Sequence, residues 1–341
     1  MSSVPDFDQL PKLDGLPQGY AWKVFDRDGE KDVLGTLNFL TPEVVKAASK
    51  EVKDGISISL NWPINALAKI PLPGRKPAEH TPIAISESMA ALGVGDISAW
   101  DDELTFNTQC SSQWDSLCHF QHQPSSLGYN GSKPTHESLR VESTVGNKLP
   151  SLDHWHSRGC LVGRGVLLDY KAYADAKGIA FHAFDAVRIT VEELEACAAH
   201  QGVDFRPGDV LLVRTGATEV FDKPAPEVFT KMASGKLAGV HGCEDTARWI
   251  WNKRFAAVAS DSPAFEAFPP LKPDGTEGTM ADLVLHPYLL AGFGMSIGEF
   301  WDLSRLAEYC GKTGRYSFML TSAPLNHPGL VASPPNALAI F

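Results

Sequence analysis

The sequence lacks the features that mark membrane and secreted proteins. No apolar run approaches the roughly 20 residues that a membrane-spanning helix requires. The opening residues, Met1 to Asp6, contain neither the basic region nor the apolar region of a secretory signal. The six cysteines include no Cys-x-x-Cys pair, which indicates reduced thiols rather than a disulfide framework. We therefore expect a cytoplasmic protein that does not enter a membrane.

Basic patches and common cofactor motifs are also missing. The 30 Lys and Arg residues are outnumbered by 41 Asp and Glu residues, which gives a formal net charge of −11. Nucleic acids and anionic membranes repel a field of this sign, so neither is an expected partner. There is no Walker loop, no Gly-x-Gly-x-x-Gly and no His-Glu-x-x-His. The expected partner is a small-molecule substrate.

The sequence does contain enough apolar residues for a sizeable core. Of its 341 residues, 43% are hydrophobic, which allows two domains or one α/β domain. Strands and helices alternate through residues 160–320, which favours one α/β domain over residues 31–341 after an N-terminal extension over residues 1–30. The expected strands are Leu161–Asp169, Val210–Arg214, Ala256–Ser260, Tyr316–Leu320 and Ala337–Phe341; the expected helices are one that begins with a capping box at Thr190, then Cys243–Arg254, Met280–Ala291 and Ile297–Glu308.

The first half of the chain has weaker patterns. Thr41-Pro42 is a typical helix start, with a hydroxyl N-cap followed by proline at the first helical position. Alternating residues predict a strand at Ile56–Leu60, and another is expected at Leu104–Thr108. Residues 61–100 show no clear period and predict an irregular excursion. Residues 121–158 predict a long loop around a site.

The densest group of reactive side chains lies between Gln109 and His119. Asp115 and His119 are four residues apart, and Gln109 and Gln113 have the same spacing. A helix would place each pair on one face, and a loop following a strand could also bring the four together. A carboxylate beside an imidazole is the usual arrangement of a general base with a fixed tautomer. The same pair could instead hold a loop by a hydrogen bond.

Other candidate residues are more isolated in the sequence. His286 and Glu299 flank an apolar, glycine-containing segment that could bring them together, although such a pair is also common at a surface. His241 lies between two glycines before a predicted helix, where it could orient a substrate or simply be exposed. Cys110 and Cys118 are thiolate candidates, but small buried apolar residues are the commoner role of such cysteines.

Together these residues resemble a known signature. The chain is similar to the cyclase family of metal-dependent hydrolases, which includes kynurenine formamidase and isatin hydrolase, and whose signature is His-x-Gly-Thr-His-x-Asp-x-Pro-x-His. Gln109 and Gln113 stand at its first two histidines, Asp115 and His119 match its aspartate and last histidine, and Leu117 replaces its proline. The similarity continues in order to the end of the chain, through Gly163–Asp169, Ile189–Leu194, Arg206–Gly216, Ala257–Asp261, and His286 with Ile297–Glu299.

The resemblance carries expectations about fold, assembly and chemistry. It implies a swivelling β/β/α fold, a homo-oligomer (dimer or tetramer), and hydrolysis of a C–N bond in a small amide, formamide or cyclic amide. It also implies a bound Mn²⁺ or Zn²⁺ that lowers the pKa of water, with His119 acting as general base and then acid. We expect Asp115, His286 and Glu299 to hold the metal, with Gln113 or Gln109 assisting, and His119 and Asp115 to form the catalytic pair. The expected substrate contacts are Gln109, Gln113, Trp114 and His241.

The two glutamines leave the metal requirement open. Replacing two imidazoles by carboxamides removes two good nitrogen donors, and the oxygen-rich set that remains favours Mn²⁺. The rival arrangement is a metal-free pocket in which the glutamines donate hydrogen bonds to a substrate carbonyl. The alternatives to a hydrolase are a metal-independent lyase, dehydratase or cyclase that uses Asp115 and His119, or a non-catalytic small-molecule binder.

Overall fold

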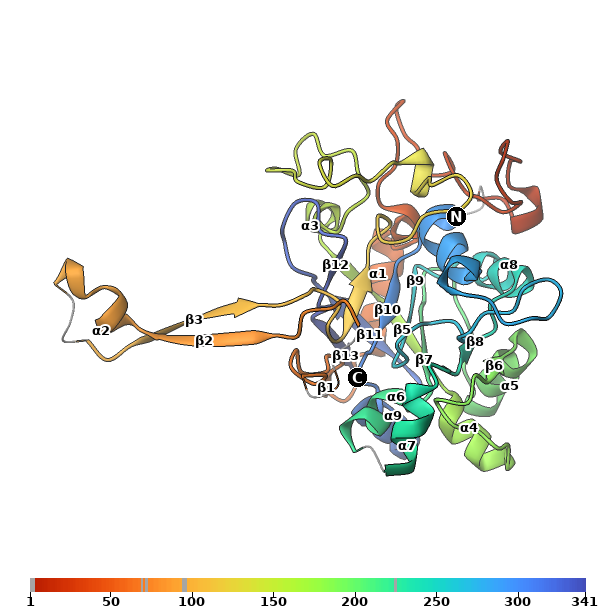
Figure 1. Cartoon of the computed structure of the whole chain (residues 1–341). Coiled ribbons are helices and arrows are strands. Elements are labelled where there is room, and N and C mark those ends of the chain that lie inside the picture. The colour runs from red at the N-terminus through yellow and green to blue at the C-terminus, as the bar shows by residue number, and fades with distance from the viewer. Residues whose placement is uncertain (1–3, 69, 71–72, 94–96, 224–225) are drawn as a thin grey trace.

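A nine-stranded sheet forms the centre of the computed structural model, which describes residues 4–68, 70, 73–93, 97–223 and 226–341 (Figure 1). Its neighbouring strands follow the order β1-β13-β11-β5-β7-β9-β10-β4-β12. From β5 through β7 and β9 to β10 the strands are parallel, and the strands that flank this group are antiparallel to it. The bounds are β1 Ser57–Ser59, β4 Gln113–Asp115, β5 Leu161–Asp169, β7 Val210–Arg214, β9 Ala257–Ser260, β10 Ile297–Glu299, β11 Ser317–Ser322, β12 Ala332–Ser333 and β13 Ala337–Ile340.

The parallel strands β5, β7 and β9 are mainly apolar, which is typical of strands that are buried on both faces of a sheet. Val166 of β5 faces a core formed with helices α4, α5 and α8, whereas Leu167 faces a second core formed with α9. The predictions for β5, β7 and β9 are confirmed, and so is the capping box in which Thr190 and Glu193 begin α5. The helices are α1 Pro42–Ala48, α3 Asp153–Arg158, α4 Tyr170–Lys177, α5 Val191–Gln201, α6 Ala217–Asp222, α7 Pro226–Ala233, α8 Glu244–Asn252 and α9 Ser304–Thr313.

The N-terminal segment packs into the first of these cores. Phe7, Tyr20 and Phe25 are all buried there, and the ring of Phe25 lies 6.4 Å from that of Trp251 in α8. The backbone N–H of Phe7 donates to the side chain of Asn252 at 2.9 Å. No helix among the described residues is long and apolar enough to cross a membrane.

A two-stranded arm projects from the body of the molecule (Figure 1). Strand β2 (Glu79–Ala84) pairs antiparallel with β3 (Trp100–Thr105), and a short helix α2 (Ile85–Ser88) follows β2. The prediction of an irregular excursion over residues 61–100 is therefore wrong for the arm, and the strand expected at Leu104–Thr108 begins earlier. Both faces of the arm are exposed, so no apolar alternation marks its strands.

Two helices predicted near the C-terminal end are also wrong. The segment Met280–Ala291 contains one short 3₁₀ turn and the start of a π-helix, Pro287–Phe293. Pro287 would lie in the interior of the predicted helix, where proline has no backbone N–H to donate, but it is tolerated at the start of the π-helix. Ile297–Glu299 is strand β10, and α9 starts only at Ser304. Gly298 has no room for a side chain, since a Cβ there would lie 2.7 Å from Ala259 of β9. A buried strand of three residues is too short to show the alternation of apolar and polar residues that would distinguish it from a helix in the sequence.

Candidate functional site

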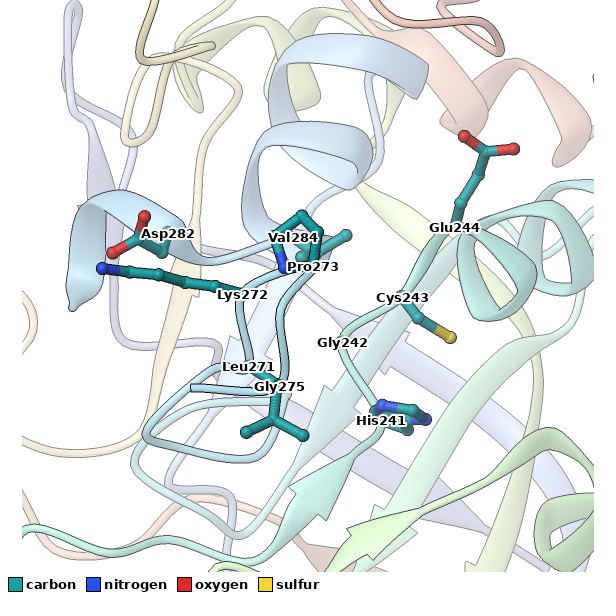
Figure 2. A pocket seen from close by; sticks show the side chains of 10 residues that line it. All are labelled: His241, Gly242, Cys243, Glu244, Leu271, Lys272, Pro273, Gly275, Asp282 and Val284. Atoms are coloured by element: carbon teal, nitrogen blue, oxygen red, sulfur yellow. The ribbon is translucent and has the colours of Figure 1, made fainter. Parts of the chain in front are cut away.

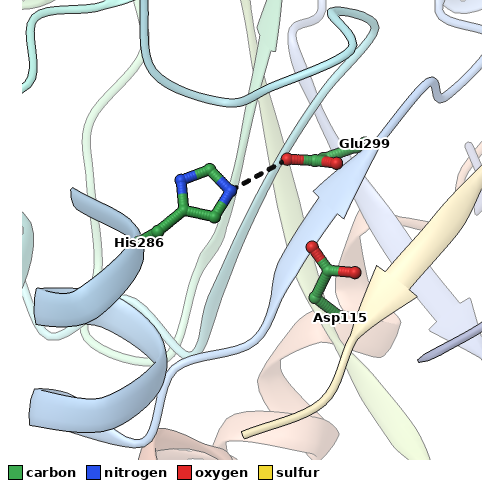
Figure 3. Close-up of side chains that lie close together, drawn as sticks. All are labelled: Asp115, His286 and Glu299. Carbon is green, nitrogen blue, oxygen red and sulfur yellow. Dashed lines mark hydrogen bonds and ion pairs between the residues drawn. The ribbon is translucent and has the colours of Figure 1, made fainter. Parts of the chain in front are cut away.

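Two paired strands and the start of the π-helix bring three ionisable side chains together (Figure 3). Strands β4 and β10 are antiparallel, with Gln113 opposite Glu299 and Asp115 opposite Ile297. Residues two apart in a strand share a face, so the two carboxylates lie on the same side of the sheet. His286 immediately precedes the π-helix. Asp115, His286 and Glu299 are buried, and each offers a potential ligand atom within 4.8 Å of the others.

The two glutamines of the signature bind the two carboxylates. The side-chain amide of Gln113 donates to Glu299 at 2.7 Å, and that of Gln109 donates to Asp115 at 2.7 Å. Both glutamines are buried, and neither is among the described residues that line the adjacent cavity. The role of Gln109 and Gln113 as substrate contacts stays a prediction. In the structure their side-chain amides bind the carboxylates of Asp115 and Glu299.

His119 lies beside the cluster at the edge of the cavity. Its Nε2 is 3.9 Å from Asp115 Oδ2, too far for a hydrogen bond. The amide nitrogen of Gln109 lies 3.4 Å from both ring nitrogens of His119, next to its shorter bond with Asp115. The imidazole is therefore linked to Asp115 through Gln109, and one face of the ring is open to the cavity.

Burial and neighbouring charges set the protonation of the cluster. Burial, reinforced by the charge of Glu299, raises the pKa of Asp115 well above its usual value. Burial lowers the pKa of His119 to about 4, so this ring is neutral at neutral pH. Burial also disfavours a charged His286, but hydrogen bonds and charges from Glu266 and Glu299 outweigh that effect and raise the pKa of His286 to about 10. His119 is thus the imidazole that can accept a proton.

Glu266 is a buried member of the site that the sequence did not reveal. Its carboxylate accepts the Nδ1 hydrogen of His286 at 2.8 Å, and His286 Nε2 lies 3.2 Å from Glu299. Backbone N–H groups of Val284, Leu285 and His286 also donate to Glu266. These bonds fix both the ring and the loop that carries it. No motif surrounds Glu266, so only the fold could identify it.

An apolar cavity of about 630 Å³ opens above the cluster. His119, His286 and Glu299 form part of its wall. Arg75 also lines it and donates to the backbone carbonyl of Gln109 at 2.9 Å. The sequence did not indicate Arg75, which lies in the excursion without a motif. The apolar lining includes Phe120, Phe184, Phe221, Phe229, Phe268, Met232, Met280, Leu237 and Leu283.

None of the described residues of 121–158 lines this cavity, contrary to the predicted loop around a site.

Trp114 differs from its predicted role as a substrate contact. Because it alternates with Gln113 and Asp115 along β4, its side chain points to the opposite face of the sheet. There it is fully buried, donates to the hydroxyl of Ser322 at 2.8 Å, and packs against Trp301 with ring centroids 4.8 Å apart. Trp114 therefore supports the core beneath the site.

His241 lies in a separate hollow of about 420 Å³ (Figure 2). This hollow is lined by the loop before α8, including Cys243, and by residues such as Lys272 and Asp282. His241 does not line the cavity that His119 borders. His241 follows strand β8 (Gly239–Val240) and lines this hollow rather than the cavity, although the next residue, Gly242, lies close to the site, since a Cβ there would be 2.4 Å from the carboxylate of Glu266.

The segment Gly294–Gly298 has the Gly-x-Ser-x-Gly spacing of a serine-hydrolase elbow. In that elbow the serine lies on a turn from a strand into a helix. Ser296 instead is buried just before strand β10. This geometry does not support a nucleophilic serine.

The residues of the cluster fit a hard divalent cation. Asp115 Oδ2 is a buried oxygen without a hydrogen-bond partner. Two carboxylates and one imidazole form a donor set that suits ions such as Mn²⁺ and also Zn²⁺. A histidine that ligates a metal usually donates its other ring N–H to a carboxylate, and Glu266 receives such a bond from His286. Gln113 lies next to these potential ligands because its side-chain amide donates a hydrogen bond to Glu299.

Comparisons with known proteins agree with this architecture. A family model described as "Putative cyclase" matches residues 55–267. The crystal structure of a novel cyclase is 31% identical, with a TM-score of 0.76 over 94% of this chain and 99% of that one. Isatin hydrolase A from Ralstonia solanacearum is 14% identical, with a TM-score of 0.55 over 88% of this chain and 98% of that one. An isatin hydrolase bound to the product analogue thioisatinate is 16% identical, with a TM-score of 0.52 over 87% and 95% of the two chains. The isatin hydrolases thus share the fold, and no curated protein matches in sequence.

Proposed function

Because this chain belongs to the cyclase family, we propose that it is a hydrolase that cleaves a C–N bond in a small amide, formamide or cyclic amide. The observation that carries the proposal is the buried cluster of Asp115, His286 and Glu299 beside a neutral His119 at the wall of an apolar cavity. Isatin hydrolases with the same fold act on a cyclic amide, which is consistent with this class. The cavity can enclose a small molecule.

Asp115, His286 and Glu299 would hold the divalent cation, Mn²⁺ or Zn²⁺, with Gln113 beside them. When bound, such an ion polarises a carbonyl and lowers the pKa of water so that hydroxide forms at neutral pH. Glu266 fixes the ring of His286 so that Nε2 faces the cluster. The two glutamines hold the carboxylates of Asp115 and Glu299 in place.

His119 would transfer the protons of the reaction. Its neutral imidazole, exposed to the cavity, can take a proton from the attacking water. The resulting imidazolium can then give that proton to the departing nitrogen, so that one residue serves as base and then as acid. Gln109 lies within 3.4 Å of the ring and limits its rotation.

Arg75 would bind the polar end of the substrate. Its guanidinium lines the cavity, and among the described residues no carboxylate forms an ion pair with it. Five phenylalanines enclose the rest of the space. We therefore propose a substrate with an aromatic or other flat apolar body and a carbonyl or carboxylate group that faces Arg75 and the cluster.

One observation favours a second function, a metal-independent lyase, dehydratase or cyclase. The hydrogen bonds of Gln109, Gln113 and Glu266 already satisfy most of the polar atoms of the cluster. A charged His286 between two carboxylates also compensates their charge without a cation. In that case His119 and Asp115 would act as the acid and base.

The two functions are separated by assaying one panel of compounds. The panel contains N-formyl arylamines, cyclic aryl amides and matched β-hydroxy acids, each tested with chelated protein and with protein loaded with Mn²⁺ or Zn²⁺. A hydrolase should open or deformylate the amides only when metal is present. Elimination of water from the hydroxy acids by the chelated protein, with no amide cleavage in either state, would refute the hydrolase proposal and support the second function.

A further inference from the structure

Phe300, the residue after strand β10, has an unusual backbone conformation. Its φ is +54°, in the left-handed region that a bulky side chain rarely adopts. Phe300 directly follows Glu299, one of the three ionisable residues of the cluster. A conformation of this kind is energetically costly and persists only where the surrounding structure enforces it. The contacts of Phe300 therefore bear on the placement of Glu299.

Both backbone polar groups of Phe300 are bonded to the surrounding structure. Its N–H donates to the carbonyl of Ser262, just beyond the end of β9, at 3.1 Å. Its carbonyl accepts a hydrogen bond from the hydroxyl of Ser112 at 2.5 Å. Ser112 is buried and accepts in turn from the backbone N–H of Trp62 at 2.7 Å. The chain after Glu299 is thus held between the end of β9 and the residue that precedes β4.

The ring of Phe300 is also confined by its neighbours. It is fully buried and stacks on Trp62, with ring centroids 6.1 Å apart and 19° between the ring planes. It also lies beside Phe221 of the cavity wall, with centroids 5.9 Å apart. The indole N–H of Trp62 donates to Asp222 at 2.8 Å, which holds the stacking partner in place. This packing and the two backbone bonds together keep Phe300 in its left-handed conformation.

The same contacts determine the position of the Glu299 carboxylate. Gln113 lies opposite Glu299 in the paired strands β4 and β10, and its amide donates to that carboxylate at 2.7 Å. Ser112 immediately precedes Gln113, and Phe300 immediately follows Glu299, so the bond between Ser112 and Phe300 joins the two strands directly beside this pair. A relaxed backbone at Phe300 would break that bond and turn the chain away from Gln113.

We propose that Phe300 is a positioning residue for Glu299: its left-handed backbone, fixed by Ser112, directs the carboxylate of Glu299 into the cluster. The relevance of this placement to metal binding rests on the proposed function, in which Glu299 helps to hold the cation. Neither Ser112 nor Phe300 is among the described residues that line the cavity, so both act through Glu299 and not on the substrate.

The substitution Ser112→Ala tests the bond to Phe300, with Ser111→Ala as the matched control. Ser111 is also buried, but its hydroxyl donates to the carbonyl of Pro63. The probe is Co²⁺, because its visible absorption depends on the arrangement of its ligands. Ser112→Ala should weaken Co²⁺ binding about 10- to 100-fold and alter the spectrum, and Ser111→Ala should do neither. Ser112→Thr keeps the hydroxyl and should restore the wild-type spectrum. Co²⁺ binding by Ser112→Ala that equals the wild type would overturn the proposal.

Two variants at Phe300 separate the effect of the backbone from that of the ring. Phe300→Gly and Phe300→Ala both remove the ring, but only glycine adopts a positive φ without strain. Phe300→Gly should therefore bind Co²⁺ about tenfold more tightly than Phe300→Ala, in line with the cost of the left-handed conformation for other residues. Equal or weaker binding by the glycine variant would show that the backbone at this position does not direct Glu299.

A measurement without metal separates this proposal from the proposed function. In the chelated protein the ¹⁵N-labelled side-chain amide of Gln113 reports its hydrogen bond with Glu299. Ser112→Ala should shift this signal toward that of an amide in water, and Ser111→Ala should leave it unchanged. If the wild type binds no Co²⁺ but Ser112→Ala shows this shift, the metal-dependent function fails and the positioning of Glu299 stands. An unchanged Gln113 signal in Ser112→Ala would overturn the positioning whether or not metal binds.

Discussion

Glu266 accepts the Nδ1 hydrogen of His286 at 2.8 Å, so the other ring nitrogen of His286 faces Glu299. Glu266 is itself fully buried and receives three backbone N–H bonds from residues 284–286. The side chain of His286, the proposed metal ligand, and the loop that carries it are thus fixed by one carboxylate.

The substitution Glu266→Gln tests this relationship. An amide cannot accept all four hydrogen bonds with the strength of a carboxylate, so the ring of His286 should lose its fixed tautomer. We expect metal affinity to fall about 10- to 100-fold, measured by competition with a fluorescent chelator. The control is Glu244→Gln, a carboxylate outside the cluster that binds Tyr288. Unchanged affinity in a folded Glu266→Gln protein would show that His286 is not a ligand positioned by Glu266.

His119→Ala should remove proton transfer while leaving the metal site intact. General acid–base catalysis contributes about 10²- to 10⁴-fold, so kcat should fall by that factor. Metal content should be unchanged, because His119 is outside the group of Asp115, His286 and Glu299. Turnover at the wild-type rate would remove His119 from both proposed mechanisms.

Restoring imidazoles at Gln109 and Gln113 should strengthen binding of zinc. The double variant Gln109→His/Gln113→His adds two nitrogen donors next to Asp115 and Glu299, whose carboxylates the glutamines now contact. We expect Zn²⁺ affinity to rise at least tenfold relative to Mn²⁺ affinity, measured by titration calorimetry. Gln121→His, outside the cluster, is the matched control. Equal affinities in the wild type and the double variant would show that these side chains do not face the ion.

Asp209 should make stability depend on pH. Burial raises the pKa of Asp209 to about 6 despite its bond to Arg164, whereas an unfolded aspartate titrates near 3.9. The folded protein therefore binds this proton more tightly, so the contribution of Asp209 to stability is present below pH about 4 and is lost as pH rises through 6. The two-unit difference corresponds to about 2–3 kcal/mol.

Urea unfolding at pH 4, 5, 6 and 7 measures this contribution. Asp209→Asn should flatten the pH dependence of the free energy of unfolding in this window, whereas Asp175→Asn, at an exposed aspartate, should leave it as in the wild type. Parallel curves for the wild type and Asp209→Asn would contradict the assignment.

The central strands and one half of the candidate site could be predicted from the sequence. Strands such as Leu161–Asp169 are long apolar runs, and the residues between Gln109 and His119 are close in the chain. The family resemblance also paired His286 and Glu299 with that segment, and the structure brings them to Asp115. An element can be predicted from the sequence when its local pattern of apolar residues matches the residues that are buried in the folded protein.

The remaining features depend on contacts that no local pattern encodes. Strand β10 exists because Gly298 fits against Ala259 of β9, which is a tertiary contact. Trp114 looked like a wall of the site because it is adjacent to Asp115, but alternation along β4 turns it to the core. Glu266 and Arg75 reach the site from segments without motifs. The arm was missed because neither of its faces is buried.

The central claim is that Asp115, His286 and Glu299 hold a divalent metal. The most direct measurement is elemental analysis of protein purified without added metal, for the wild type and for Glu299→Gln. We predict about one Mn or Zn per wild-type chain, and strong depletion in Glu299→Gln with the fold retained. Wild-type protein that contains no stoichiometric metal, and whose activity a chelator does not change, would contradict the account.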